Sequence, residues 1–207
     1  MNKHRIEALS DGIFAVAMTL LVFGFKADAI GPGLHLDWHR FRPQLLSYIL
    51  SFLIVGVYWV AHHIEFHFVQ KANRSFLWCN NLFLMSVAFL PFPASLLGEN
   101  PGSRPVILLY GCTLIVANAT LTITWYCAWR TGLLHPNLPE RFPMFVTLLT
   151  SAPALVYAVA VLISFFNRTI PPVLFAAVPA FFIVPTKFLE RRVSGALAQI
   201  TGSAEPS

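Results

Sequence analysis

Six apolar stretches, each close to the length that a helix needs to cross a bilayer, constrain this chain more than any other feature. A spanning helix takes about 20 mostly apolar residues. The predicted spans are residues 8–25, 44–64, 75–97, 105–129, 144–166 and 172–188. The last span contains Pro179 and Pro185, which predict kinks because proline removes a helical hydrogen bond. The sequence therefore predicts an all-α integral membrane protein with six transmembrane helices and the lipid bilayer as its surroundings.

The composition agrees with a membrane location. Hydrophobic residues make up 57% of the chain and charged residues 11%, against about 25% charged in an average soluble protein. No basic run of the kind that binds nucleic acid is present, so nucleic acid is excluded as a partner. Lysine and arginine are more frequent in the predicted loops on the N-terminal side of the membrane, which places both termini in the cytoplasm. Residues 1–192 then form one six-helix transmembrane domain, and residues 193–207 form a cytoplasmic tail predicted to be disordered.

The first span begins with a group of polar residues, Arg5, Ser10 and Asp11, which we call the polar foot. The span is uncharged from Ile13 to Phe25, yet Ser10 and Asp11 stand at its start and Arg5 precedes them. A carboxylate at a membrane edge needs water, a partner or hydrogen bonds. Ser10 and Asp11 are therefore predicted to cap the first turn, with Arg5 as a charge partner. Asp11 also argues against a secretory signal peptide at residues 1–29, because the start of such a segment is basic.

An apolar stripe runs along the same span. At 100° per residue, Val16, Leu20 and Phe23 share a narrow sector, and Thr19 lies beside it. Around a central pathway this stripe would form stacked apolar rings and one layer of hydroxyls. The spacing alone is more typical of a face that contacts lipid or the protein core.

Histidines cluster at the end of the second span. His63 and His67 are four residues apart and share a helical face, while His62 points elsewhere. Two imidazoles at this spacing can chelate a metal, but the zinc-protease order HExxH is absent. A membrane enzyme with a histidine-bound metal stays a minor alternative, and neither a structural metal nor a cofactor is expected. The other interpretation is that one histidine bonds to the polar foot.

Two adjacent asparagines, Asn80 and Asn81, interrupt the third span shortly after Trp78. Unsatisfied amides are costly in hydrocarbon, so both need partners. Because this span starts on the cytoplasmic side, the asparagines lie at a depth near Asp11 and the histidine pair. We therefore predict one polar network that locks the first three helices together. Its members are Arg5, Ser10, Asp11, Trp59, His62, His63, Trp78, Asn80 and Asn81.

The run from Arg5 to Gly12 resembles the R-x-x-x-F-S-D-G signature of the bacterial TMEM175-like channel family. The resemblance continues in order along the chain and is concentrated in its first 95 residues. It includes Trp59 with His62 and His63, Trp78 with Asn80 and Asn81, and Pro91 with Phe92. The resemblance implies a potassium channel without a P-loop filter, which assembles as a homotetramer in the bacterial inner membrane. The permeant ions would be monovalent cations, chiefly K⁺.

In that family the first helix lines the pore. The resemblance implies that Val16, Leu20 and Phe23 form an apolar constriction and that Thr19 contributes to selectivity. It also implies a structural role for Arg5, Ser10 and Asp11. Two departures are visible: Leu9 replaces the usual Phe of the signature, and Val16 and Phe23 stand where Ile and Leu are commoner. The narrowest ring can therefore lie at a different level.

An apolar ring can close by dewetting, without a moving charge. No carboxylate lies on the stripe, so only weak to moderate discrimination of K⁺ from Na⁺ is expected. A channel of this kind is not expected to have enzyme activity. The alternative to a leak channel is a secondary transporter. That class favours paired broken helices and an ionisable residue at mid-depth, whereas here only the last span is broken by proline.

Overall fold

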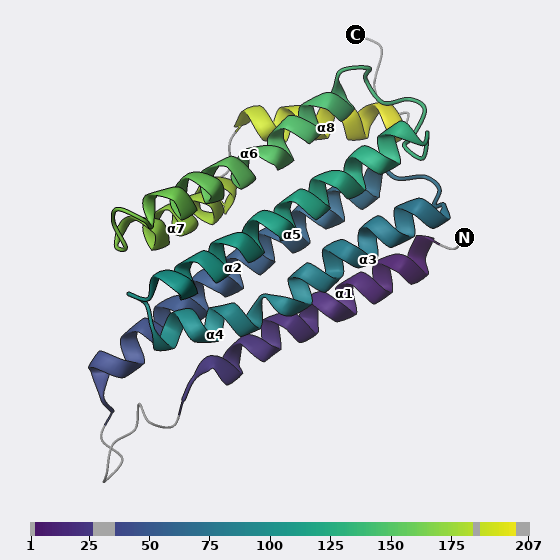
Figure 1. Ribbon diagram of the computed structural model, residues 1–207. Helices are drawn as coiled ribbons and strands as arrows, with labels where there is room; N and C mark the ends of the chain where they lie inside the picture. The colour runs from purple at the N-terminus through teal and green to yellow at the C-terminus, as the bar shows by residue number, and fades with distance from the viewer. Residues whose placement is uncertain (1–2, 27–35, 184–186, 202–207) are drawn as a thin grey trace.

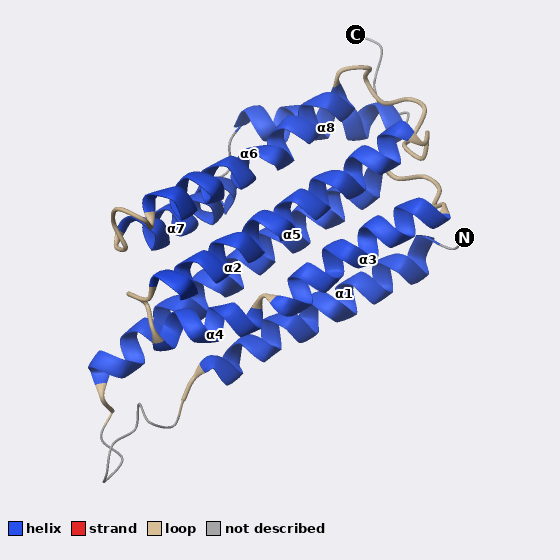
Figure 2. Cartoon of the chain, viewed as in Figure 1, coloured by secondary structure: helices blue, strands red, loops and turns tan. Residues whose placement is uncertain are grey.

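The computed structural model describes residues 3–26, 36–183 and 187–201, and over these residues the fold is helical (Figures 1 and 2). Val69 and Leu134 form an isolated antiparallel bridge. The helices are α1 (Lys3–Leu20), the 3₁₀ turn η1 (Leu21–Gly24), α2 (Trp38–Phe68), α3 (Arg74–Phe89), α4 (Pro91–Glu99), α5 (Arg104–Arg130), α6 (Phe142–Ile163), α7 (Ile170–Ile183) and α8 (Lys187–Thr201).

Within the described residues, five helical stretches are long and apolar enough to cross a bilayer, so the chain is a multi-pass membrane protein. They are Lys3–Gly24, Trp38–Phe68, Arg74–Glu99, Arg104–Arg130 and Phe142–Ile163. Each coincides with one of the first five predicted spans. The sixth corresponds to α7, whose 14 residues rise about 21 Å, less than the roughly 30 Å of a hydrocarbon core. Pro179 lies inside α7, and Pro185 lies outside the described residues.

The third predicted span is two helices rather than one. Proline at position 91 has no N–H to donate, and its ring clashes with the carbonyl one turn earlier. The N–H of Leu90 bonds to the Val87 carbonyl at 3.1 Å, which tightens the last turn of α3. Pro91 then occupies the first turn of α4, where a missing N–H costs least.

The end of the chain differs from the expected disordered tail, because α8 continues through Thr201. Val193, Ala196, Leu197 and Ile200 follow the spacing of one helical face. This face packs with Phe142 on α6 in an apolar cluster. Burial of the face accounts for the helix, whereas a tail without such a face would fray.

The helices form three layers (Figure 1). The α2 and α5 helices lie in the middle, with α1, α3 and α4 on one side and α6 and α7 on the other. Hydrogen bonds between helices reinforce the packing: Ser51 pairs with the Tyr110 hydroxyl at 2.9 Å, and the Tyr58 hydroxyl donates to the Leu114 carbonyl at 3.1 Å. Such bonds matter in a membrane, where water does not compete for the same groups.

Candidate functional site

One face of α1 is buried against the rest of the subunit. Its buried residues, Ile6, Ser10, Phe14 and Ala17, recur every three or four positions. The Phe14 ring lies 5.9 Å from Phe83 on α3 and 5.7 Å from the ring of His62 on α2. These contacts fix the rotation of α1 about its own axis, and with it the direction of the opposite face.

A buried chain of hydrogen bonds joins α1, α2 and α3 at this face. The Asn80 amide nitrogen donates to Ser10 Oγ at 3.3 Å, and Ser10 Oγ donates to the Ile6 carbonyl at 2.9 Å. On the other side, Asn80 Oδ1 lies 2.9 Å from His62 Nε2. Because an amide oxygen only accepts, Nε2 is the donor. All three side chains are buried, so the chain supplies the partners that the interior requires.

Asp11 has a separate partner. The Trp59 indole N–H donates to Asp11 Oδ1 at 2.9 Å, which ties α1 to α2 near the surface of the subunit. The expectation that Ser10 and Asp11 cap the helix is wrong. Since α1 begins at Lys3, both residues lie more than one turn inside it and their backbone N–H groups are within the helix.

The structure does not bring the remaining predicted members into this network. Arg5, His63, Trp78 and Asn81 are exposed, and in the described part of the subunit no hydrogen bond or ion pair joins them to Ser10, Asp11 or Asn80. Helix geometry is the reason. Arg5 is six residues before Asp11 and so lies on a different face, and Asn81 is turned 100° from Asn80. The His63 ring lies beside the Trp59 ring, at 5.9 Å between ring centroids.

The apolar stripe lies on the exposed side of α1. Val16 is 56% exposed, Leu20 41% and Phe23 75%, and Thr19 is exposed beside them. The 3₁₀ turn places Phe23 almost above Leu20, because residues three apart eclipse in that geometry. The Thr19 hydroxyl donates to the Val16 carbonyl at 2.8 Å, so its oxygen lone pairs remain available.

The histidines are spread over several environments. His62 is buried in the hydrogen-bonded chain, whereas His63 and His67 are exposed. Among the described residues, no group of three or more His, Cys, Asp or Glu side chains is placed to hold a metal ion. His35 lies outside those residues.

Sequence reasoning did not single out Glu65, a polar residue one turn before the end of α2. Its side chain is buried, and Oε1 has no hydrogen-bond partner within the described part of the chain. The signal was visible in the sequence as a single acid in the run from Trp59 to Phe68, where it is flanked by aromatic and apolar residues.

Comparison with known proteins identifies the family. The model for the endosomal/lysosomal potassium channel TMEM175 matches residues 5–91, which hold α1, α2 and α3. A potassium channel of Streptomyces collinus is 36% identical over 143 residues, covering 65% of this chain and 68% of the relative. A potassium channel of Chamaesiphon minutus is 39% identical over 144 residues, covering 66% of this chain and 71% of the relative.

A solved structure shares the fold. The crystal structure of a lysosomal potassium-selective channel TMEM175 homolog from Chamaesiphon minutus aligns with a TM-score of 0.74 and 28% identity. The alignment covers 87% of this chain and 95% of that one. The chain therefore belongs to the bacterial branch of the TMEM175 family, a family of ion channels rather than enzymes.

Proposed function

We propose that this protein is a potassium-permeable leak channel of the bacterial inner membrane, formed by four copies of the chain around a central axis. Relatives named as potassium channels support the permeant ion. The family model covers the first three long helices, which supports a pathway built from this part of the chain. In this proposal α7 is the sixth spanning helix, both termini are cytoplasmic, and residues 193–207 follow the six-helix domain of residues 1–192.

The exposed stripe of α1 carries the proposal. Contacts of Phe14, Ser10 and Asp11 tie α1 to α2 and α3, so the stripe has a fixed direction away from its own subunit. Four copies meeting along this stripe would place rings of Val16, Leu20 and Phe23 around the axis. The ring of Thr19 hydroxyls would lie among them.

Apolar rings suit a pathway that closes without charged groups. A narrow ring of hydrocarbon loses its water when it closes, and ions then cannot cross. The Thr19 hydroxyls supply oxygen lone pairs to a partly dehydrated cation. With hydroxyls and pore width as the means of discrimination, K⁺ is preferred over Na⁺ only weakly to moderately.

Polar substitution of the stripe tests the constriction. Val16→Asn, Leu20→Asn and Phe23→Asn should each increase K⁺ flux from liposomes loaded with K⁺, because an amide holds water in the ring and removes the barrier. Val22→Asn is the matched control: Val22 is also apolar and exposed, but lies one residue from Phe23 and is turned away from the stripe. Equal flux in the wild type and the three stripe variants would contradict the assignment.

The role of Thr19 is tested by Thr19→Val, which keeps the side-chain shape and removes the hydroxyl. The expected result is a lower K⁺ to Na⁺ permeability ratio with ion flux retained. The measurement is the reversal potential of channels in planar bilayers with K⁺ on one side and Na⁺ on the other. An unchanged reversal potential would assign selectivity to pore width alone.

A further inference from the structure

A crevice of about 570 Å³ lies on the opposite side of α2 from its main contacts with α4. Its walls come from α2, α6, the end of α7 and Val193 of α8. They are mostly apolar and rich in aromatic rings, including Phe68 on α2, Phe145 on α6 and Phe182 on α7. The volume is within the range of sites that enclose a small organic molecule.

Glu65 is the ionisable residue among the residues that line the crevice. Its side chain is only 4% exposed, and among the residues that the structure describes its Oε1 has no hydrogen-bond partner. A buried carboxyl oxygen without a partner is costly whether the group is charged or neutral, so a ligand that donates to this oxygen would remove the cost.

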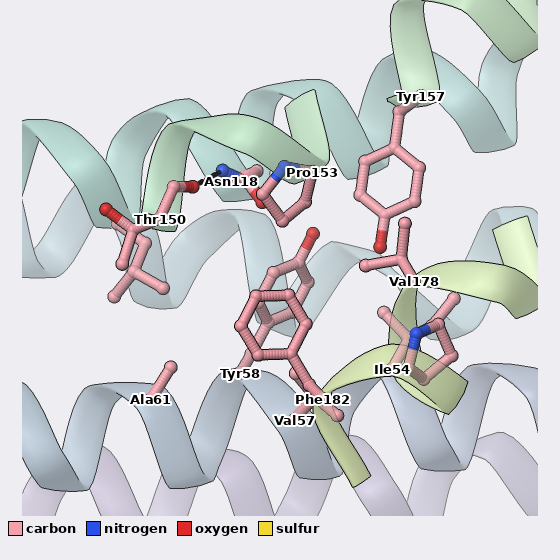
Figure 3. Close-up of a pocket in the computed structure, with 12 residues that line it drawn as sticks. Ile54, Val57, Tyr58, Ala61, Asn118, Thr150, Pro153, Tyr157, Val178 and Phe182 are labelled. Carbon is pink, nitrogen blue, oxygen red and sulfur yellow. Dashed lines mark hydrogen bonds between the residues drawn. The ribbon is translucent and has the colours of Figure 1, made fainter. Parts of the chain in front are cut away.

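The neighbouring polar groups are already satisfied and do not compete for this role. The crevice shares Val57, Ala61, Thr150 and Phe182 with a cavity of about 30 Å³, shown in Figure 3. There the Asn118 amide donates to the Thr150 carbonyl, and the Tyr58 hydroxyl donates to the Leu114 carbonyl. That cavity has room for about one water molecule, so a larger ligand is confined to the crevice.

We propose that the crevice binds an amphiphile with an ammonium head and a hydrocarbon body, with the head at Glu65. An ammonium group satisfies a carboxylate by charge and by N–H donation together. Aromatic faces also attract cations, and the guanidinium of Arg192 already lies 5.8 Å from the centre of the Phe145 ring. A pure hydrocarbon fills the same space but leaves Oε1 of Glu65 without a partner among the described residues.

Trp59 makes occupancy of the crevice measurable. Its ring belongs to the crevice wall, and its N–H bonds to Asp11 on α1. A bound amphiphile therefore contacts the residue that ties the first helix to the second. The chain has five tryptophans, so the part of a fluorescence change that is lost in Trp59→Phe reports binding in the crevice, whether or not the protein conducts ions.

The test compares three compounds with the same body, octylamine, octanol and octanoate, on the full chain in lipid nanodiscs. Octylamine, which is protonated at neutral pH, should change the tryptophan fluorescence with a Kd about tenfold or more below that of octanol, as expected for a hydrogen bond to a charged group. Octanoate should bind more weakly than both. Equal affinities for the three compounds, or tighter binding of octanoate, would overturn the proposal.

Two variants locate the site. Glu65→Gln should abolish the preference for octylamine over octanol, whereas Glu140→Gln, on an exposed loop residue, should retain it. Leu149→Phe narrows the crevice from α6 without changing the charge or adding a tryptophan, and it should weaken the binding of all three compounds. If Glu65→Gln does not fold, Leu149→Phe and the wild-type series still test the proposal. Wild-type affinities in Glu65→Gln or in Leu149→Phe would place the amine elsewhere.

Discussion

Asn80 and Asn81 are adjacent on α3 but have opposite environments. Asn80 is buried and bonds to both Ser10 and His62, whereas Asn81 is exposed. Asn80→Ala leaves a hydroxyl and an imidazole buried with fewer partners. We expect it to lower the free energy of unfolding by about 1–3 kcal/mol, the usual cost of leaving buried polar groups unsatisfied. Thermal or SDS unfolding of the purified protein in detergent measures the loss.

Asn81→Ala is the matched control, because it removes the same group from the next position. It should change the free energy of unfolding by less than about 0.5 kcal/mol, as exposed substitutions usually do. Equal losses in the two variants would mean that Asn81 has a partner in the assembled protein and that the Ser10–Asn80–His62 chain is not what stabilises α1.

The pairs Asn80/Asn81 and His62/His63 also show what the sequence alone does not predict about the site. Hydropathy and spacing indicated that polar groups on the first three helices would meet. They did not distinguish Asn80 from Asn81 or His62 from His63, because each pair is flanked by apolar residues on both sides. The choice depends on the rotation of each helix, which Phe14 and Phe83 set through packing.

At the scale of helices, α5 approaches its neighbours closely at Gly111. A Cβ placed there would meet Val161 on α6 and the Phe175 ring on α7. Gly111→Ala should therefore destabilise the protein, because overpacking costs about 1–3 kcal/mol. The helical gain of alanine over glycine, up to about 1 kcal/mol, offsets only part of this cost.

Gly195→Ala on α8 provides the contrast. Gly195 is exposed, and a Cβ there meets nothing within 4 Å. Its substitution should raise the melting temperature slightly or leave it unchanged, while Gly111→Ala lowers it. A higher melting temperature in both variants would show that α6 and α7 move away from α5 at little energetic cost.

The helices themselves were largely predictable, since long apolar stretches in this composition leave few alternatives to spanning helices. Two features were not. The α3–α4 break at Pro91 falls inside a continuous apolar stretch, where hydropathy gives no boundary. The α8 helix has low hydropathy, and its apolar face at Val193, Ala196, Leu197 and Ile200 becomes informative only once α6 offers a surface for it.

At the scale of the whole molecule, α1 has two contrasting faces. Its buried face is held by specific contacts to α2 and α3, while its exposed face is apolar except for Thr19 and the foot near Asp11. In the proposed tetramer these exposed faces meet at the axis. The assembled particle should then have four times the 23.1 kDa mass of the chain, which native mass spectrometry measures.

Cysteine cross-linking tests which helix surrounds the axis. In a background with Cys79, Cys112 and Cys127 replaced by alanine, Leu20→Cys should form disulfide-linked dimers under mild oxidation. A disulfide needs Cβ atoms about 3.5–4.5 Å apart, a separation that only a closed ring of neighbouring copies provides for this position. Leu155→Cys on α6, where the wild-type leucine is 70% exposed, should stay monomeric on a denaturing gel because that face is directed at lipid in the proposed assembly. Cross-linking at Leu155 without cross-linking at Leu20 would place α6 at the axis and remove α1 from the pathway.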